Sequence, residues 1–319
     1  MNRTGRTYLP RLQMLLVGIL LGFSSSENLW AVEKGFSIVS LSSQQSTQSL
    51  QIIESFEKQV SALFPKTEFV RYSVQKTSVE NNQILEEINK SKPTLMLTVG
   101  SESTDIGLRS KPDLPIVAAM ILNKQILKKS PRATGVLLSF PPEVHIEYIR
   151  RFLPDVNRVA TLYNPQENSQ LIDKMIKTAR AYDLKIDAMP VESIKQLPAV
   201  LKSLGRTADM LLGLPDKTVY SGKTAKAVLL STFRNRIPFA GLSPPWVKAG
   251  ALYSLDWDYA DIGRQCSVLA WKILTGTDVK DIAVVPPEKV LYVINLRTAD
   301  HMRLTINPTL VQGATKVYK

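Results

Sequence analysis

The stretch Arg158–Tyr182, RVATLYNPQENSQLIDKMIKTARAY, constrains the fold more than any other part of this chain. It predicts a buried strand at 158–162, a polar turn, and a helix with one apolar face. Asn164 suits the N-cap position and Pro165 the first helical position, while Glu167 is spaced as in a capping box. Open α/β sheets bind ligands at such loops, beside free helix amides. An ordinary capped helix in a βαβ unit explains the same residues.

The rhythm of strand, polar loop and helix continues through the rest of the chain. Further strands are predicted at 36–41, 68–74, 95–99, 116–121, 134–138, 185–191, 210–214, 238–241, 251–255 and 290–295. Strands that alternate with helices favour parallel sheets covered by helices on both faces. We therefore expect an α/β protein of two lobes joined by crossover strands, with a ligand cleft between the lobes.

The first residues predict export. Three arginines precede the apolar run 14–23, and the polar stretch SSSENLWA follows it. This order is typical of a signal peptide, here residues 1–31, and indicates a periplasmic protein. Cleavage after Ser26 and an uncleaved anchor are the alternatives.

Charge and cysteine content exclude several classes of protein. The net charge is +12, and the three Arg and one Glu of residues 1–31 leave +10 on the remainder. These charges are scattered, so we expect no nucleic-acid partner. Cys266 is the only cysteine, which leaves no disulfide and no lipid-accepting cysteine near the leader. His145 and His301 lack metal-ligand spacing, and no metal or cofactor is expected.

Two groups of residues could bind a ligand in a predicted cleft. One loop follows the strand at 95–99 and consists of Gly100, Ser101, Glu102, Ser103 and Thr104. Its hydroxyls and amides could hold a carboxylate or phosphate, although any strand-to-helix junction favours such residues.

The second group carries carboxylates. Asp216 follows a strand and could accept a ligand amine, or be a solvated turn residue. Asp256 stands at a strand-to-helix junction with Trp257 and Tyr259, where an aromatic ring could stack on a ligand and either nearby Asp could pair with a cation. Capping of the following helix by Asp258 is the structural alternative.

Longer motifs resemble a known family. The run ATGVLLSFPPEVHIEYIRRFLPDVNRVATLYNPQENS resembles the central segment of ABC-transporter substrate-binding proteins of the TrpX-like group. There a TGV strand precedes a helix ending in LPDV, followed by a strand ending in YN and a loop containing NS. The resemblance continues in LPDKTV, IPFAGL, VKAGALYSLDWDYADIGRQ and INLRTADHMRLTIN, over most of residues 94–307.

The resemblance implies a type I periplasmic-binding-protein fold, with two Rossmann-like lobes that close on a small ligand. On this plan lobe 1 comprises 32–137 plus 256–282, and lobe 2 comprises 138–255 plus 283–319. It also implies that a monomer captures an amino acid or a similar small polar molecule and delivers it to an ABC permease in the inner membrane.

Carried over by position, the family's cleft falls on Gly100, Ser101, Glu102, Ser103, Thr104, Asn164, Asn168, Ser169, Asp216 and Asp256. The serines and Asn168 would hold a ligand carboxylate, and Asp216 or Asp256 an ammonium group. The chain departs from the family pattern in acidic Glu102 within GSEST, in AAMILNKQ after the fourth strand, and in Lys217. These departures leave the amino-acid specificity open.

Two other functions remain as alternatives. A receptor of the same fold could signal to a membrane sensor or another protein instead of a permease. An exported hydrolase would need Ser243 or Ser101 as its nucleophile, but no motif joins either serine to a base.

Overall fold

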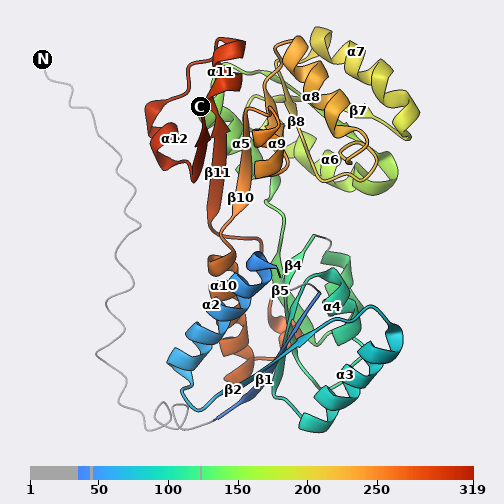
Figure 1. Ribbon diagram of the computed structural model, residues 1–319, viewed down its shortest axis with the longest axis vertical. Coiled ribbons are helices and arrows are strands. Elements are labelled where there is room, and N and C mark those ends of the chain that lie inside the picture. Colours follow the sequence, from blue (N-terminus) through green and yellow to red (C-terminus); the bar gives the residue numbers. More distant parts are fainter. Residues whose placement is uncertain (1–34, 44–45, 123) are drawn as a thin grey trace, which may run out of the picture.

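The computed structural model describes residues 35–43, 46–122 and 124–319, so the predicted signal peptide lies outside the described residues. The chain forms two lobes, one above the other in Figure 1, each around its own sheet. Lobe 1 has five strands in the order β2-β1-β3-β4-β5, and lobe 2 has seven in the order β12-β11-β10-β9-β8-β6-β7.

Lobe 1 is an all-parallel sheet with helices on its faces. Its strands are β1 (Ser37–Ser42), β2 (Glu68–Ser73), β3 (Leu95–Val99), β4 (Ile116–Ile121) and β5 (Ala133–Leu137). Its helices are α2 (Thr47–Leu63), α3 (Ser78–Ser91), α4 (Ser101–Gly107), the short 3-10 helices η1 (Lys124–Lys129) and η3 (Val279–Asp281), and α10 (Tyr259–Leu274).

Lobe 2 contains the remaining elements. Its strands are β6 (Arg158–Tyr163), β7 (Lys185–Pro190), β8 (Met210–Leu212), β9 (Phe239–Gly241), β10 (Tyr253–Trp257), β11 (Val290–Asn295) and β12 (Lys316–Tyr318). Its helices are α5 (Pro142–Phe152), α6 (Pro165–Arg180), η2 (Ile194–Gln196), α7 (Leu197–Thr207), α8 (Ala225–Arg234), α9 (Pro244–Lys248), α11 (Leu296–Met302) and α12 (Pro308–Gly313).

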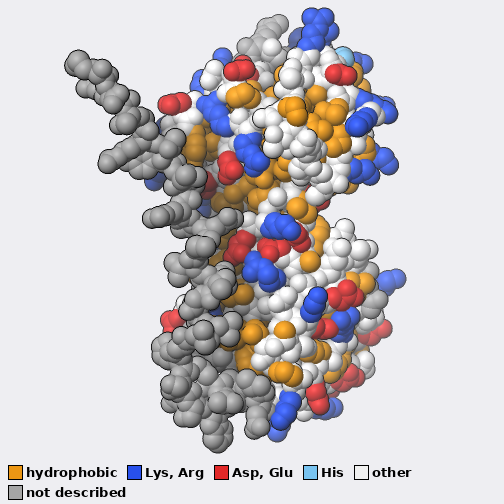
Figure 2. Space-filling view, turned by 90° about the vertical axis from the view of Figure 1, so that its left-hand side faces the viewer, with side chains coloured by type: hydrophobic (Ala, Val, Ile, Leu, Met, Phe, Trp, Pro, Cys, Tyr) orange, Lys and Arg blue, Asp and Glu red, His pale blue; other side chains and the backbone are white. Residues whose placement is uncertain are grey.

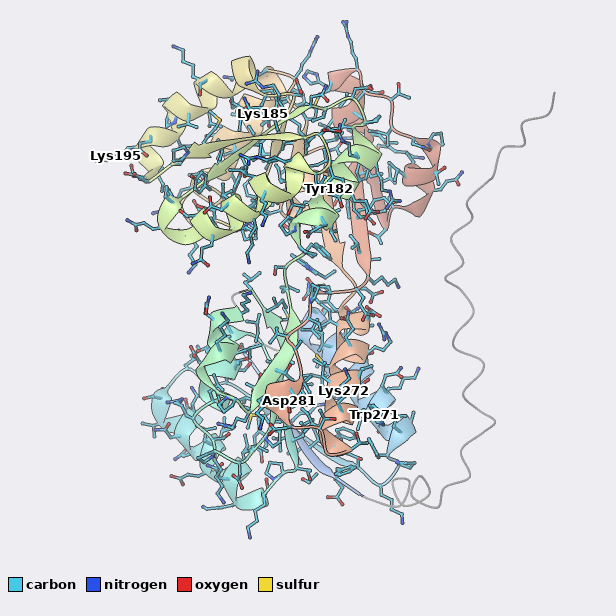
Figure 3. The ribbon with its side chains drawn as sticks, turned by 180° about the vertical axis from the view of Figure 1, so that it is seen from behind. Tyr182, Lys185, Lys195, Trp271, Lys272 and Asp281 are labelled. Carbon is cyan, nitrogen blue, oxygen red and sulfur yellow. The ribbon has the colours of Figure 1, made fainter. Side chains whose placement is uncertain are left out.

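Helix α10 belongs to lobe 1 although the preceding strand β10 belongs to lobe 2. It packs along α2, and Ile262, Cys266 and Leu269 enter the core beneath the lobe 1 sheet. Seen from behind, Trp271 lies on lobe 1 near Asp281, away from lobe 2 (Figure 3). Burial raises the pKa of the Cys266 thiol to about 12, as expected for a structural cysteine.

The path of the chain fixes which sheet edges face each other. The chain leaves lobe 1 from the carboxyl end of β5, and the other strands of that sheet are parallel to it. It leaves lobe 2 from the carboxyl end of β10, which is parallel to β9, β8 and β6. The carboxyl ends of both sets of strands therefore point toward the opposite lobe.

The fold confirms the predicted α/β architecture with two Rossmann-like lobes of the type I periplasmic-binding-protein kind. The lobe 2 sheet is not wholly parallel, however, because β11 pairs antiparallel with β10. The reason is the direction of travel: β10 runs out of lobe 2, and the chain must re-enter the same sheet through β11.

Trp257 stands at the junction of the lobes. It packs against the core between the lobe 2 sheet and α5, and also against the core between the lobe 1 sheet and α10. Its ring stacks on Phe140 with a centroid separation of 5.7 Å and an interplanar angle of 11°. One aromatic pair thus joins two of the crossing segments.

Acidic and basic side chains lie side by side at the narrowing between the lobes (Figure 2). Near the junction of the lobes, Lys289 Nζ lies 2.6 Å from Asp258 Oδ2. Arg264 of α10 bridges Asp261 and Glu288 with N···O distances of 2.7 and 2.6 Å. The Asp258–Lys289 and Arg264–Glu288 pairs connect the start of α10 with the segment just before β11, and each contributes little individually because the basic partners are exposed.

Candidate functional site

At the edge of the lobe 2 sheet that faces lobe 1, hydrogen bonds to Asp216 join the loop after β6 to the loop after β8. Oδ2 of Asp216 accepts hydrogen bonds from the Asn164 N–H (2.6 Å) and Asn168 Nδ2 (2.9 Å). Oδ1 accepts from the N–H groups of Thr218 (3.0 Å) and Val219 (2.8 Å). The predicted residues Asn164, Asn168 and Asp216 are therefore brought together, and the buried carboxylate is occupied by internal donors.

Asn164 caps α6 as the sequence predicts, and its Oδ1 accepts the N–H of Gln166 over 3.0 Å. The predicted capping box is wrong. The Glu167 carboxylate instead accepts the Lys217 N–H (3.1 Å) and the Thr218 hydroxyl (3.3 Å). A long-range partner outcompetes the local one, because the loop after β8 presents two donors to this carboxylate.

Ser169, also predicted at this edge, turns its hydroxyl to its own helix. Its Oγ donates to the Pro165 carbonyl over 2.6 Å, and the residue is exposed on the first turns of α6. It lies on the same loop-and-helix unit as Asn164 and Asn168 but forms no part of the Asp216 network.

At the lobe 1 edge, Gly100 forms the exit from β3 into α4. Its φ of +107° is a conformation that side-chain-bearing residues rarely adopt, and a Cβ there would meet Ser43 Oγ at 2.6 Å. The same Ser43 Oγ accepts the Ser103 N–H over 2.9 Å. Glycine thus permits the tight turn that starts α4.

The hydroxyls of Ser103 and Thr104 are buried and satisfied within the protein. Both donate to the Gly100 carbonyl at 2.9 Å, and Thr104 Oγ1 also lies 2.8 Å from Thr98 Oγ1. These side chains stabilise the loop in this conformation, and their contact with a ligand stays a prediction. Ser101 and Glu102 are the exposed members of the loop.

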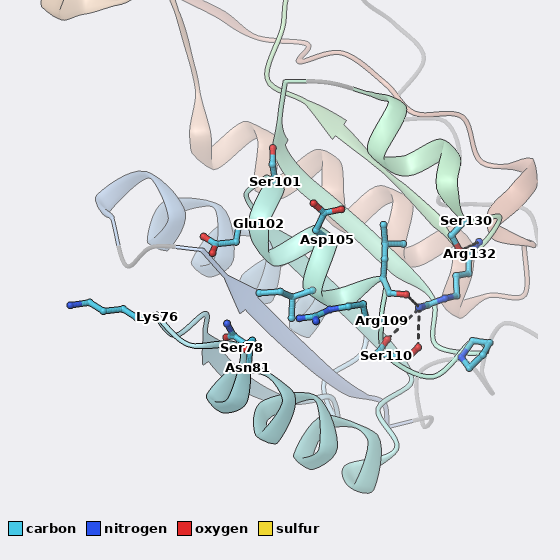
Figure 4. A pocket seen from close by; sticks show the side chains of 13 residues that line it. Lys76, Ser78, Asn81, Ser101, Glu102, Asp105, Arg109, Ser110, Ser130 and Arg132 are labelled. Carbon is cyan, nitrogen blue, oxygen red and sulfur yellow. Dashed lines mark hydrogen bonds between the residues drawn. The ribbon is translucent and has the colours of Figure 1, made fainter. Parts of the chain in front are cut away.

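A shallow groove of about 1050 Å³ begins at Ser101 and Glu102 and follows α4 along lobe 1 (Figure 4). Arg132 closes its far end and holds the backbone of the α4–β4 connection through the Leu108 carbonyl (2.9 Å) and the Leu114 carbonyl (2.6 Å). Because this guanidinium is engaged by backbone carbonyls, it has a structural role rather than that of an open anion receptor.

Asp256 ends β10 at the lobe junction, separate from the Asp216 network. It is partly buried, and its Oδ1 accepts only the neighbouring Trp257 N–H, at 2.9 Å, among the hydrogen bonds of the described residues. Burial raises the pKa of this carboxyl group, while the Trp257 N–H acts in the opposite direction. Of the predicted acidic ligand residues that follow lobe 2 strands, Asp216 is therefore satisfied within its network, whereas Asp256 has open acceptor capacity.

Phe140 and His145, which the sequence did not single out as ligand candidates, lie beside this acid's segment. His145 is partly buried, with its ring edge-on to Phe140 at 6.4 Å, and burial lowers its pKa to about 4. Imidazole is therefore neutral at pH 7. The sequence signal that could have pointed to these two residues is the Pro141-Pro142 pair, which starts α5 where the chain enters lobe 2.

The histidines of the described residues do not belong to a metal-holding cluster. In residues 35–43, 46–122 and 124–319, no group of three or more His, Cys, Asp or Glu side chains could hold a metal ion. His301 stacks on Phe233 and its Nε2 lies 3.1 Å from the Phe233 carbonyl, while His145 packs on Phe140. Nor is any helix in these ranges long and apolar enough to cross a membrane.

Comparison with known proteins identifies the family. Residues 65–318 match the family described as ABC transporter substrate binding protein. The chain belongs to that family. A substrate-binding protein of this kind binds a small ligand and works with a permease, and the family is not a class of enzymes.

The chain is also similar to one curated relative and to solved structures. The uncharacterized protein RP367 of Rickettsia prowazekii (strain Madrid E) is 24% identical over 234 residues, 72% of this chain and 74% of the relative. The structure of an ABC domain in complex with L-Trp from Streptococcus pneumonia has a TM-score of 0.59 at 17% identity, covering 89% of this chain and all of the other. The ligand-free, open structure of CD0873, a substrate-binding protein with adhesive properties from Clostridium difficile, has a TM-score of 0.73 at 17% identity and covers 89% and 99%. These likenesses show the shared fold.

Proposed function

We propose that this ABC substrate-binding protein works in the periplasm, captures an amino acid or a similar small polar molecule between its lobes, and delivers it to an importer in the inner membrane. The observation that carries the proposal is the facing of the two sheets: the carboxyl ends of β3 and β6 point toward opposite lobes. In such sheets these ends are where ligands bind. The proposal includes the lobe boundaries, with lobe 1 at 32–137 plus 256–282 and lobe 2 at 138–255 plus 283–319.

The mechanism is binding without chemical conversion. An open form accepts the ligand on one lobe, and closure brings the other lobe onto it; the ligand shifts the population because it has a higher affinity for the closed form. The aromatic pair Phe140–Trp257 and the ion pairs of Arg264 lie where the crossing segments would bend.

A thermal-shift screen of the purified protein against amino acids, amines, organic acids and sugars tests this function. A ligand at about 100 times its dissociation constant should raise the free energy of unfolding by about 2.7 kcal/mol. Small-angle scattering should then show a smaller radius of gyration in the presence of the hit. A protein that neither binds any class of small molecule nor changes shape would contradict the proposal, and recovery from the cytoplasm after cell fractionation would contradict the periplasmic location.

A further inference from the structure

The positive charge of this chain is unevenly divided between the lobes. Residues 35–137 plus 256–282, which hold the elements of lobe 1, contain 15 Lys or Arg and 14 Asp or Glu. Residues 138–255 plus 283–319, which hold those of lobe 2, contain 21 Lys or Arg and 12 Asp or Glu. The stretch 217–255 contributes most to this excess, with six Lys or Arg and no Asp or Glu. In Figure 2, basic side chains gather along the right-hand edge of the upper lobe.

Helix α8, inside that stretch, exposes only basic and apolar side chains. Leu230 and Phe233 are 41% and 40% exposed, while Val228 and Thr232 are buried on the other side of the helix. The exposed face of a surface helix is ordinarily polar, so two large apolar side chains between cations are unusual there. At helical spacing one side of α8 carries all of its exposed residues, which are Lys226, Ala227, Leu230, Phe233 and Arg234.

Helix α11 lies against the end of α8 and extends this face. The ring of Phe233 stacks on His301 with a centroid separation of 3.8 Å and an interplanar angle of 4°, and His301 Nε2 lies 3.1 Å from the Phe233 carbonyl oxygen. The exposed aromatic ring is therefore held in place. Arg297 is exposed one turn before His301, and Arg236 and Arg303 are exposed just after α8 and α11. The exposed face of α8 together with these three arginines is named the distal patch.

The cations of the distal patch form no ion pair within the described residues. This holds for Lys226, Arg234, Arg236, Arg297 and Arg303. Asp300 is the exposed acid of α11, and it also lacks an ion pair in this part of the chain. Elsewhere in lobe 2, Arg158 and Lys185 do pair with Asp187. A group of cations that the protein does not neutralise attracts a partner of negative charge.

The distal patch lies away from the edges at which the lobes face each other. Because the carboxyl end of β8 points toward lobe 1, α8 starts near the facing edge and ends at the opposite edge, before β9. Strand β11 runs antiparallel to β10, so α11 follows it at that opposite edge, at the top of the molecule in Figure 1. A partner bound there would leave the facing edges open.

We propose that the distal patch docks on the surface of a membrane that contains anionic phospholipid. Lipid phosphates present charges of one sign, which matches a face whose cations have no ion pairs of their own. The boundary between head groups and acyl chains accepts Leu and Phe side chains, as it does from interfacial helices. Protein interfaces pair charges of both signs, whereas the stretch 217–255 has no acid to offer. The inference goes beyond the proposed function, since it concerns where the protein is held and needs no bound solute.

Co-sedimentation with vesicles tests the inference. Purified protein is mixed with vesicles of phosphatidylcholine alone and with vesicles of equal parts phosphatidylcholine and phosphatidylglycerol. We expect stronger binding to the anionic vesicles, and loss of that difference at high salt, because salt screens exposed charges. Binding to the neutral vesicles measures any contribution of the apolar run 14–23. Anionic vesicles that bind no more protein than neutral ones would overturn the proposal.

The double variant Lys226→Gln with Arg234→Gln tests whether this face makes the contact. Each basic residue near an anionic surface changes affinity by about fivefold, so the pair should lower binding to the anionic vesicles by about 20-fold. Lys58→Gln with Lys272→Gln is the matched control, because it removes the same charge from exposed positions on α2 and α10 of lobe 1. The control should stay within about twofold of the parent protein. Equal losses in the two double variants would show that net charge alone drives binding, and would overturn the assignment to the distal patch.

Leu230→Gln distinguishes a lipid surface from other polyanions. This variant keeps every charge but removes an exposed apolar side chain, so it should weaken binding to the anionic vesicles by about threefold or more. Unchanged vesicle binding would overturn the lipid surface, and tight binding of soluble polyglutamate to the same variant would then assign the face to an acidic polypeptide. None of the substituted residues belongs to the predicted ligand set. Hits in the thermal-shift screen should therefore persist in every variant, which separates this inference from solute capture.

Discussion

The backbone N–H of Asn164 donates a 2.6 Å hydrogen bond to Oδ2 of Asp216, across 52 residues of sequence. This contact ties the start of α6 to the loop that follows β8, and Asn168 adds a second bond to the same oxygen. The acid therefore fixes the edge of lobe 2 before any ligand is present. Removal of the Asp216 carboxylate should therefore lower the stability of the protein.

The variant Asp216→Ala should lower the free energy of unfolding by roughly 2–4 kcal/mol, because buried N–H groups of three residues lose a charged acceptor. Urea denaturation followed by circular dichroism measures the effect. Asp173→Ala, at an exposed position of α6, is the control and should change stability by less than about 0.5 kcal/mol. Similar losses in the two variants would show that the network does not stabilise the fold.

The turn at Gly100 should reject a side chain. Gly100→Ala places a Cβ 2.6 Å from Ser43 Oγ at a φ of +107°, so we expect a destabilisation of about 1–3 kcal/mol. Gly222→Ala is the control, since a Cβ there meets nothing within 4 Å. Melting temperatures of the two variants measure this difference in stability. A Gly100→Ala protein as stable as the control would mean that the loop can shift to accommodate the Cβ.

His145 should make stability depend on pH. Its folded pKa of about 4 lies below the usual 6.5, so the unfolded chain binds more protons between these values. Stability is then fully present above about pH 6.5 and is lost as the pH falls toward 4, by roughly 1–3 kcal/mol for a partly buried group.

Urea unfolding at pH 7.5, 6 and 5 measures this loss. His145→Asn should show a shallower decline than the parent protein. An unchanged slope in His145→Asn would place the acid sensitivity in other groups.

Trp257→Ala should weaken the connection between the lobes. The ring packs against both cores and stacks on Phe140, so its loss should cost about 2–4 kcal/mol, somewhat below a fully buried tryptophan. Trp271→Ala removes the same side chain from a position that is 45% exposed and should cost less than about 1 kcal/mol. Calorimetry would also reveal whether one unfolding transition splits into two; equal costs would contradict a junction role for Trp257.

Local signals in the sequence were sufficient for the alternation of strands and helices. The strands at 95–99 and 116–121 have the predicted bounds, because short apolar runs ending at polar or glycine residues indicate buried parallel strands. Asn164 caps α6 as expected, since capping needs only neighbouring residues.

Long-range pairing could not be obtained in this way. No local pattern indicated that Glu167 accepts hydrogen bonds from Lys217 and Thr218 rather than from its own helix, or that β11 runs antiparallel to β10. Both depend on which segments the fold brings together. The short helix α9 was not predicted either.

The sequence was sufficient to predict which loops form the candidate site, but not the directions in which their side chains point. The loops after β3, β6, β8 and β10 all lie at facing sheet edges, as their positions after strands implied. Only the structure shows that the hydroxyls of Ser103 and Thr104 turn inward while Asp256 keeps open acceptors. Hydroxyl direction depends on which carbonyl lies nearby, and sequence patterns carry no information about that.

The placement of α10 in lobe 1 has a consequence for how the chain acquires its structure. The core of lobe 1 needs Ile262 and Cys266, and the lobe 2 sheet needs β11 and β12 from the last thirty or so residues. Neither lobe can complete its core while the final third of the chain is still being synthesised. Contacts of such long sequence separation form slowly, so the nascent chain stays open until it is nearly whole.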